Sequence, residues 1–264
     1  MNTTQFLTSQ WVLSPVGLAG AAVALVFYFR RFGWNQRAWW MIAAVAVVLF
    51  TLMSPLATLA NGYLFSAHMA QHILLLLAAP GLAMMAIPAG TRTPRGLERV
   101  LQPAVCWACG VGAMWLWHAP VLCDAAVASR AVSAVQTISL LALGGAFWWQ
   151  VAAPCEAQRI APLQGVVYLA TACAACTALG IIFTFSPITV CNAYAHPVDR
   201  LGIEEMLYGT WGMNPIRDQQ VGGLLMWVPM CLVYLGAIFG QLARWYGAPA
   251  ESSEQFKLNY GHLD

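Results

Sequence analysis

Five histidines offer the side chains best suited to chemistry in this sequence, and two of them are four residues apart. His68 and His72 lie in the segment Ser66-Ala-His-Met-Ala-Gln-His72. Residues four apart share one face of a helix, about 6 Å apart along its axis, so these imidazoles can bind one ion together. His118 is a candidate for a third nitrogen ligand, and Asp218 for a ligand or for a residue that orients one. The pattern predicts a metal site built from His68, His72, His118 and Asp218.

Each of these residues also has a structural explanation. A histidine near the end of a membrane span can hydrogen-bond to interface water, and Asp218 can cap the helix that it opens. His196 precedes Pro197 in a loop, where a histidine needs no special explanation. Imidazole is a suitable ligand for copper, zinc, iron and nickel, whereas a thioether ligand favours Cu(I). Methionine more often fills packing gaps between helices. The candidate thioethers are Met69, Met226 and Met230.

The elements that position these residues follow from composition. The chain has 264 residues, of which 60% are hydrophobic and 8% charged, against about 25% charged residues in a soluble domain. Seven apolar segments are long enough for membrane helices, and they lack the alternation of barrel strands. We therefore predict an all-α bundle of seven transmembrane helices in one domain, residues 1–247, with a short cytoplasmic tail, residues 248–264. The predicted spans are 11–29, 38–60, 67–89, 101–119, 131–150, 163–186 and 221–243.

Basic residues give this bundle a direction. Nine of the 12 Lys and Arg residues fall in one set of loops, and three fall in the other. The positive-inside rule then places the N-terminus outside and the C-terminus in the cytoplasm, with His68, His72, His118 and His196 outside and His262 in the tail. The inner set is Arg30, Arg31, Arg37, Arg92, Arg95, Arg99, Arg159, Arg244 and Lys257, and the outer set is Arg130, Arg200 and Arg217.

The eight cysteines do not form the framework of a small secreted protein. Cys106-x-x-Cys109 and Cys173-x-x-Cys176 lie within apolar runs, where cysteine is usually a packing residue. Cys123 and Cys191 fall in outer loops, where a disulfide, a role in copper transfer or two unpaired thiols are all compatible with the sequence. The segment 187–220 is compatible with an amphipathic helix on the membrane, a lid over the histidines or a docking surface for a partner.

Three motifs, taken in order, resemble the multi-span CtaG family of cytochrome c oxidase assembly factors. They are His68-Met-Ala-Gln-His72 followed by Ala79-Pro80, then Trp117-His118-Ala-Pro120, then Asp218-Gln-Gln-Val-Gly-Gly-Leu-Leu-Met-Trp-Val-Pro229. The resemblance implies a non-enzymatic assembly factor of caa-type oxidases in the bacterial cytoplasmic membrane. It also implies a functional cluster of His68, His72, His118 and Asp218 on the periplasmic face, with a role in making the copper centre.

The resulting hypothesis is a factor that holds copper transiently and passes it to an oxidase subunit. Its expected partners are oxidase subunits or other assembly factors within the lipid bilayer, with no nucleic acid. One alternative is a redox protein with haem between His72 and His118, which would leave His68 surplus. Another is a metal or proton transporter, which the scarcity of charge in the middle of the spans disfavours.

Overall fold

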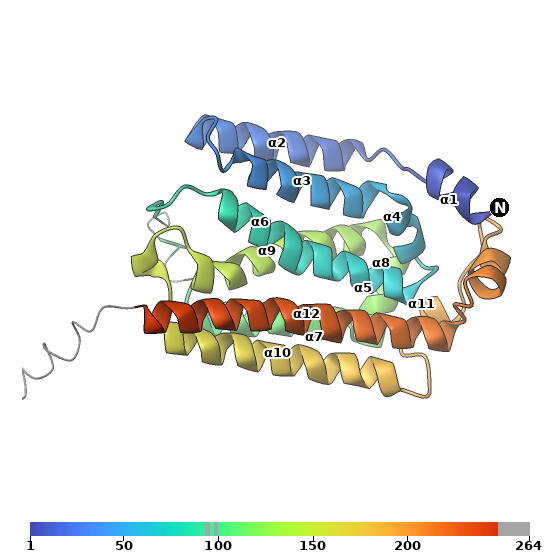
Figure 1. Ribbon diagram of the computed structural model, residues 1–264. Helices are drawn as coiled ribbons and strands as arrows, with labels where there is room; N and C mark the ends of the chain where they lie inside the picture. The colour runs from blue at the N-terminus through green and yellow to red at the C-terminus, as the bar shows by residue number, and fades with distance from the viewer. Residues whose placement is uncertain (93–95, 98–99, 248–264) are drawn as a thin grey trace, which may run out of the picture.

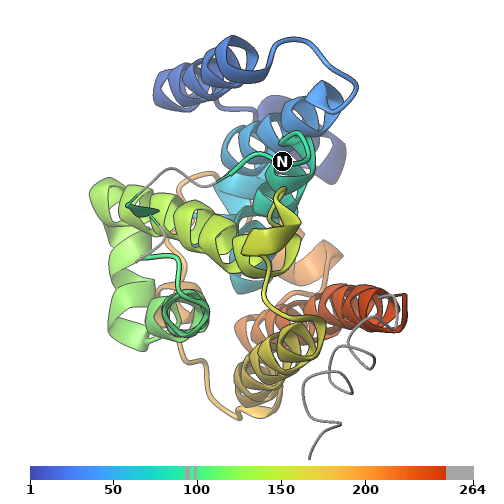
Figure 2. The same ribbon diagram turned by 90° about the vertical axis from the view of Figure 1, so that its left-hand side faces the viewer.

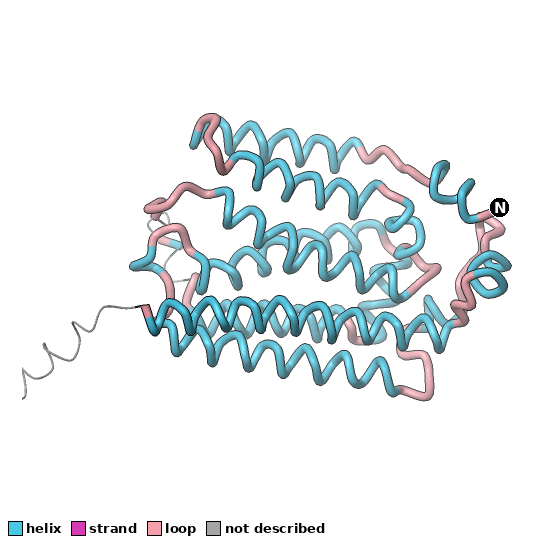
Figure 3. The backbone as a smooth tube through the Cα atoms, in the orientation of Figure 1, coloured by secondary structure: helices cyan, strands magenta, loops and turns pink. Residues whose placement is uncertain are grey.

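The computed structural model describes residues 1–92, 96–97 and 100–247, and this part of the chain is helical with no strand (Figures 1 and 3). Arg95, Arg99, Lys257 and His262 lie outside the described residues, as does the predicted tail. The main helices are α2 Pro15–Phe32, α3 Ala38–Met53, α4 Pro55–Ala60, α5 Phe65–Ile73, η1 Leu74–Ala78, α6 Ala79–Ala86, α7 Pro103–Trp117, α8 Pro120–Ala128, α9 Arg130–Ala152, α10 Pro162–Phe185 and α12 Pro215–Tyr246. The short ones are α1 Thr3–Ser9, η3 Glu156–Gln158, α11 Asn192–Ala195 and η4 Met206–Thr210.

All seven predicted segments contain helix, but not all as single straight spans. In the described part of the chain, five helices are long and apolar enough to cross a membrane, or six if the bent pair α7 and α8 counts as one span. The segment 38–60 is broken because Ser54 ends α3, and its hydroxyl then caps α4 at the Leu56 amide. The fourth segment continues beyond its predicted end at residue 119, where Pro120 starts α8 after a 74° bend.

The long helices lie side by side, with α2 at the periphery of the bundle and α10 beside α12 (Figures 1 and 2). The ends of α5, α8 and α11 gather at one end of the bundle, which we call the histidine end (Figure 1). Arg30 and Arg31 lie in the last turn of α2, at the opposite end. The bundle therefore has two ends of different chemical character.

A widened turn interrupts the third apolar segment directly after His72. Residues Leu74–Ala78 form the π-helical turn η1, and Pro80 follows it. Proline has no N–H to donate to the carbonyl four residues earlier, which is that of Leu76. That carbonyl faces Gly144 of α9 so closely that a Cβ there would collide with it. A π-helical turn often marks a functional site, and this one lies next to the histidines.

Glycines allow α10 and α12 to approach closely. A Cβ built on Gly223 would lie 2.5 Å from Thr184 Oγ1 and 2.6 Å from the Thr184 amide nitrogen. A Cβ on Gly180 would lie 2.8 Å from Trp227 Cβ. Small residues serve this purpose in membrane bundles, where close van der Waals packing holds the helices together.

We expect Gly223→Ala to lower the free energy of unfolding by about 2 kcal/mol, since overpacking a tight contact typically costs this much. Gly236→Ala on the same helix is the matched control, because no heavy atom lies within 4 Å of its added Cβ. Thermal unfolding of the purified variants measures the difference. Equal midpoints for the two variants would contradict the packing explanation.

Candidate functional site

The structure brings three of the predicted site residues together. His68 and His72 lie on α5, and His118 follows the last residue of α7. The ring centres of His68 and His72 are 4.4 Å apart, and those of His72 and His118 are 4.9 Å apart. The three residues are between 2% and 5% exposed. The structure therefore places these imidazoles next to one another, which the sequence alone could not show.

The nitrogen atoms of this cluster are incompletely hydrogen-bonded. His118 Nδ1 contacts the Met114 carbonyl oxygen at 2.5 Å, and His118 Nε2 lies 3.0 Å from Met69 Sδ. Within the described part of the chain, His68 Nε2 and both ring nitrogens of His72 are buried and make no hydrogen bond of normal geometry, although the Gln136 side chain lies near His72. Leaving a polar group buried without a partner costs about 1–3 kcal/mol, so such groups call for an explanation.

The cluster as it stands is not a completed metal centre. Among the described residues, no group of three or more His, Cys, Asp or Glu side chains is arranged to hold a metal ion. The ring spacings are nevertheless close to the distance of about 5 Å expected between imidazoles on one ion, given metal–nitrogen bonds of about 2 Å.

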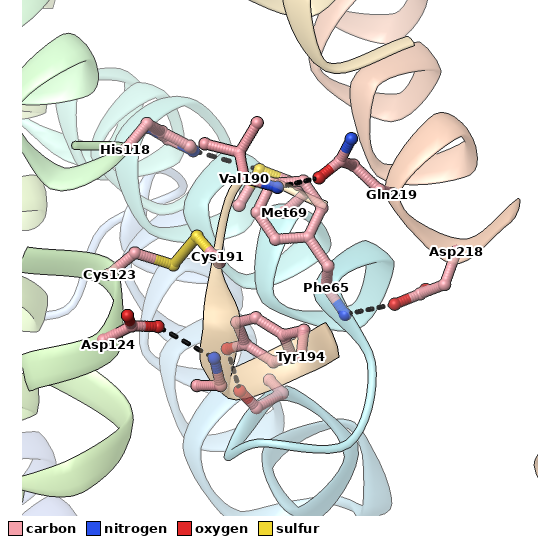
Figure 4. The surroundings of a disulfide bond; sticks show 12 residues. Phe65, Met69, His118, Cys123, Asp124, Val190, Cys191, Tyr194, Asp218 and Gln219 are labelled. Carbon is pink, nitrogen blue, oxygen red and sulfur yellow. Dashed lines mark hydrogen bonds between the residues drawn. A yellow bond between two sulfur atoms is a disulfide. The ribbon is translucent and has the colours of Figure 1, made fainter. Parts of the chain in front are cut away.

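Asp218 lies beside the cluster and is engaged with the backbone of α5. Its Oδ2 accepts a hydrogen bond from the Phe65 amide at 2.5 Å (Figure 4). Its Oδ1 accepts from the Ser66 amide at 3.1 Å and the Ser66 hydroxyl at 2.5 Å. Leu64, the N-cap residue of α5, supplies no side-chain cap. Asp218 thus caps α5 from another helix, while Asn214 caps its own helix, α12. Of the three roles expected for Asp218, capping its own helix is wrong, because Asn214 does so, and this geometry favours orienting the histidine-bearing helix.

Other residues of the motif Asp218–Pro229 also connect α12 to its neighbours. Gln219 Oε1 accepts from the Val190 amide at 2.6 Å, and its Nε2 donates to the Ile188 carbonyl at 2.9 Å. A Cβ on Gly222 would lie 2.6 Å from Phe65 Cδ1, so only glycine lets α5 approach α12 this closely. The motif therefore holds both α5 and the chain after α10 against α12.

Residues 188–195, which we call the outer strap, cross the histidine end beside the cluster. A disulfide joins Cys191 to Cys123 of α8, with a Cα–Cα distance of 6.1 Å. Tyr194 donates its hydroxyl hydrogen to the Ala60 carbonyl at 2.6 Å (Figure 4). Its ring lies 5.6 Å from that of His68. Asp124 Oδ1 accepts from the Ala193 amide at 2.8 Å.

This arrangement decides between readings that the sequence left open. Of the three possibilities for Cys123 and Cys191, the structure contains the disulfide. Before α12 begins at Pro215, the segment 187–220 contains α11 and the π-helical turn η4 as helices, and its outer strap fits the lid alternative. No sequence signal pointed to Tyr194, although its position three residues after Cys191 places it on the tethered part of the strap.

The remaining candidates lie elsewhere. His196 is exposed and lines an open hollow of about 700 Å³ together with Arg217 and Gln220. Met226 and Met230 are fully buried in the main hydrophobic core. Of the three candidate thioethers, Met69 is the one with a contact to a cluster histidine.

Apolar helices long enough to cross a membrane, with buried imidazoles gathered at one end, define a multi-span membrane protein with a polar site near one face. The model of one family, described as cytochrome c oxidase caa3 assembly factor (Caa3_CtaG), matches residues 21–248. The chain therefore belongs to this family, as its three motifs predicted. No curated protein and no solved structure matches the chain.

Proposed function

We propose that this assembly factor binds copper transiently through His68, His72 and His118 and passes it to a nascent oxidase subunit. The observation that carries the proposal is the set of buried imidazole nitrogens without partners, His68 Nε2 and both nitrogens of His72. An ion ligated by His68 Nε2 and by one ring nitrogen of His72 would supply two of the three missing interactions. In this proposal copper is cargo, and the protein catalyses no reaction.

Ligand chemistry supports copper as the cargo. Imidazole alone accepts several transition metals, but a thioether adds a preference for Cu(I). Met69 Sδ lies 3.0 Å from His118 Nε2, so a soft ligand is at hand beside the three imidazoles. Asp218 would hold α5 in place through the amides of Phe65 and Ser66.

The spacing of the rings disfavours the haem alternative. Two imidazoles on opposite sides of a haem iron keep their ring centres about 6 Å apart, with the porphyrin plane between them. The ring centres of His72 and His118 are 4.9 Å apart, with an interplanar angle of 86°. A porphyrin would require these helices to separate.

The proposed topology has seven spans, with the N-terminus outside and the C-terminus in the cytoplasm. In this topology the 16-residue α3 crosses together with α4, and α7 with α8 forms one bent span. The Cys123–Cys191 disulfide supports placing the histidine end outside, because disulfides persist in oxidising compartments. Arg30, Arg31 and Arg244, at the opposite end, support the same direction. The site would then face the periplasm, where oxidase subunits or other assembly factors could receive copper.

Copper content tests the proposal. We expect the histidine cluster of the purified protein to bind one equivalent of Cu(I), and His68→Ala and His72→Ala each to weaken the binding of this equivalent at least tenfold, since each removes a ligand. His196→Ala is the matched control, because this exposed histidine lies outside the cluster. A wild-type protein that binds no copper, together with normal oxidase copper in cells carrying the double variant, would contradict the proposal.

A further inference from the structure

A second pair of soft ligands lies between α10 and α12, away from the histidine cluster. The Sγ atoms of Cys173 and Cys231 are 3.1 Å apart. Thr177, one turn after Cys173, places its Oγ1 3.1 Å from Cys231 Sγ. The sequence motif joins Cys173 with Cys176, whereas the structure joins Cys173 with a residue 58 positions further along the chain.

The helix backbones hold this pair together. On one side of it, Gly180 and Gly223 leave no room for a Cβ between the helices. On the other side, a Cβ on Gly165 would lie 3.0 Å from Gln241 Oε1. The two helices are thus in close contact on both sides of the sulfurs, which keeps the two cysteines next to each other.

The surroundings of the pair are uncharged. Neither α10 nor the part of α12 between residues 219 and 243 contains a charged residue. Cys173, Cys231 and Thr177 are half-buried, so they lie at the edge of the bundle within reach of an apolar reagent. Such a site disfavours any complex with a net charge, because burying an unpaired charge is costly.

We infer that Cys173 and Cys231 form a binding site for one thiophilic monovalent cation of the Cu(I) class. One thiol loses its proton on binding and the other stays protonated, so the reaction is 2 RSH + M⁺ → RS–M–S(H)R + H⁺. The resulting complex is neutral, as the surroundings require. The Thr177 hydroxyl donates to the thiolate of Cys231, and thiolate sulfur selects soft ions over Mg²⁺ or Ca²⁺.

A Cu(I) titration tests the inference, with bicinchoninate as the competing chelator. The protein carries His68→Ala and His72→Ala, so that the proposed outer site does not contribute. We expect this protein to retain one equivalent of Cu(I), and addition of Cys173→Ser or Cys231→Ser to weaken binding at least a hundredfold. Cys109→Ser is the control and is expected to leave binding unchanged, because this exposed thiol lies outside the pair.

Phenylarsine oxide provides a second measurement on the unaltered protein, which avoids any folding defect of the variants. It bridges two adjacent thiols by the reaction PhAsO + 2 RSH → PhAs(SR)₂ + H₂O. We expect it to protect Cys173 and Cys231 together from alkylation, among the six free cysteines. Absence of this protection, isolation of the two residues as a disulfide, or Cu(I) binding that survives both serine substitutions would each overturn the inference. None of these outcomes bears on the histidine cluster, so the two proposals fail separately.

Discussion

Replacing Asp218 with alanine is expected to lower the free energy of unfolding by about 3 kcal/mol and to displace the histidines of α5. The carboxylate accepts three hydrogen bonds, from the amides of Phe65 and Ser66 and from the Ser66 hydroxyl, and the residue is 1% exposed. Its removal leaves buried donors at the start of α5 without an acceptor, and the loss of one member of a buried network that includes a charge commonly costs this much.

A graded series makes this prediction specific. Ser66→Ala removes a single donor and is expected to cost about 1 kcal/mol. The loss of stability in Asp218→Asn is expected to lie between those of Ser66→Ala and Asp218→Ala. The side-chain oxygen of asparagine still accepts a hydrogen bond, but its NH₂ group would face an N–H donor of α5. Thermal unfolding gives the order of stabilities, and Cu(I) titration shows whether affinity falls with it. Loss of Cu(I) affinity in Asp218→Asn at unchanged stability would show that the carboxylate is a ligand, and would contradict the orienting role.

Reducing the Cys123–Cys191 disulfide is expected to make His68 and His72 accessible and to lower the free energy of unfolding by about 2–4 kcal/mol. The bond closes a loop with a sequence separation of 68, and loops of this length gain substantially from a cross-link. It also tethers the outer strap, whose Tyr194 ring lies 5.6 Å from that of His68. Without the bond, the strap is held only by noncovalent contacts, which are hydrogen bonds such as those from Tyr194 and Ala193 and the packing of Tyr194 in the core.

Histidine modification by diethyl pyrocarbonate, mapped by mass spectrometry, measures this opening. We expect His68 and His72 to react at least tenfold faster after reduction, whereas the exposed His196 reacts equally in both states and serves as the internal reference. Tyr194→Phe removes one tether but keeps the ring, so a smaller increase is expected. Unchanged protection of His68 in protein with a verified free Cys123 thiol would contradict the role of the strap as a lid.

Under the proposed function, the strap affects copper exchange. The three histidines are at most 5% exposed, so copper that enters or leaves the cluster from the histidine end requires movement of the covering chain. The strap is the one covering segment that a reversible covalent bond ties down. Its mobility is therefore expected to set the rate of copper exchange, while the imidazoles set the affinity.

Composition and local pattern determined most of the architecture. Long apolar segments with so few charges have no stable alternative to membrane helices, because every backbone polar group must find its partner within the segment. The distribution of arginine predicted the two different ends, and the spacing of His68 and His72 placed both imidazoles on one helix face. These properties depend on residues close together in the sequence, so the sequence reveals them.

Only the tertiary structure decided the contacts between distant segments. Asp218 caps α5 and not its own helix, across a separation of 153 residues, and Cys173 pairs with Cys231 and not with the neighbouring Cys176. The Cys123–Cys191 disulfide and the position of Tyr194 over His68 are also contacts between segments far apart in the sequence. The physical reason is that helix period and hydropathy specify which face of a helix is buried. Which helix meets that face depends on close packing at residues such as Gly222 and Gly223, and that packing exists only once the helices have assembled.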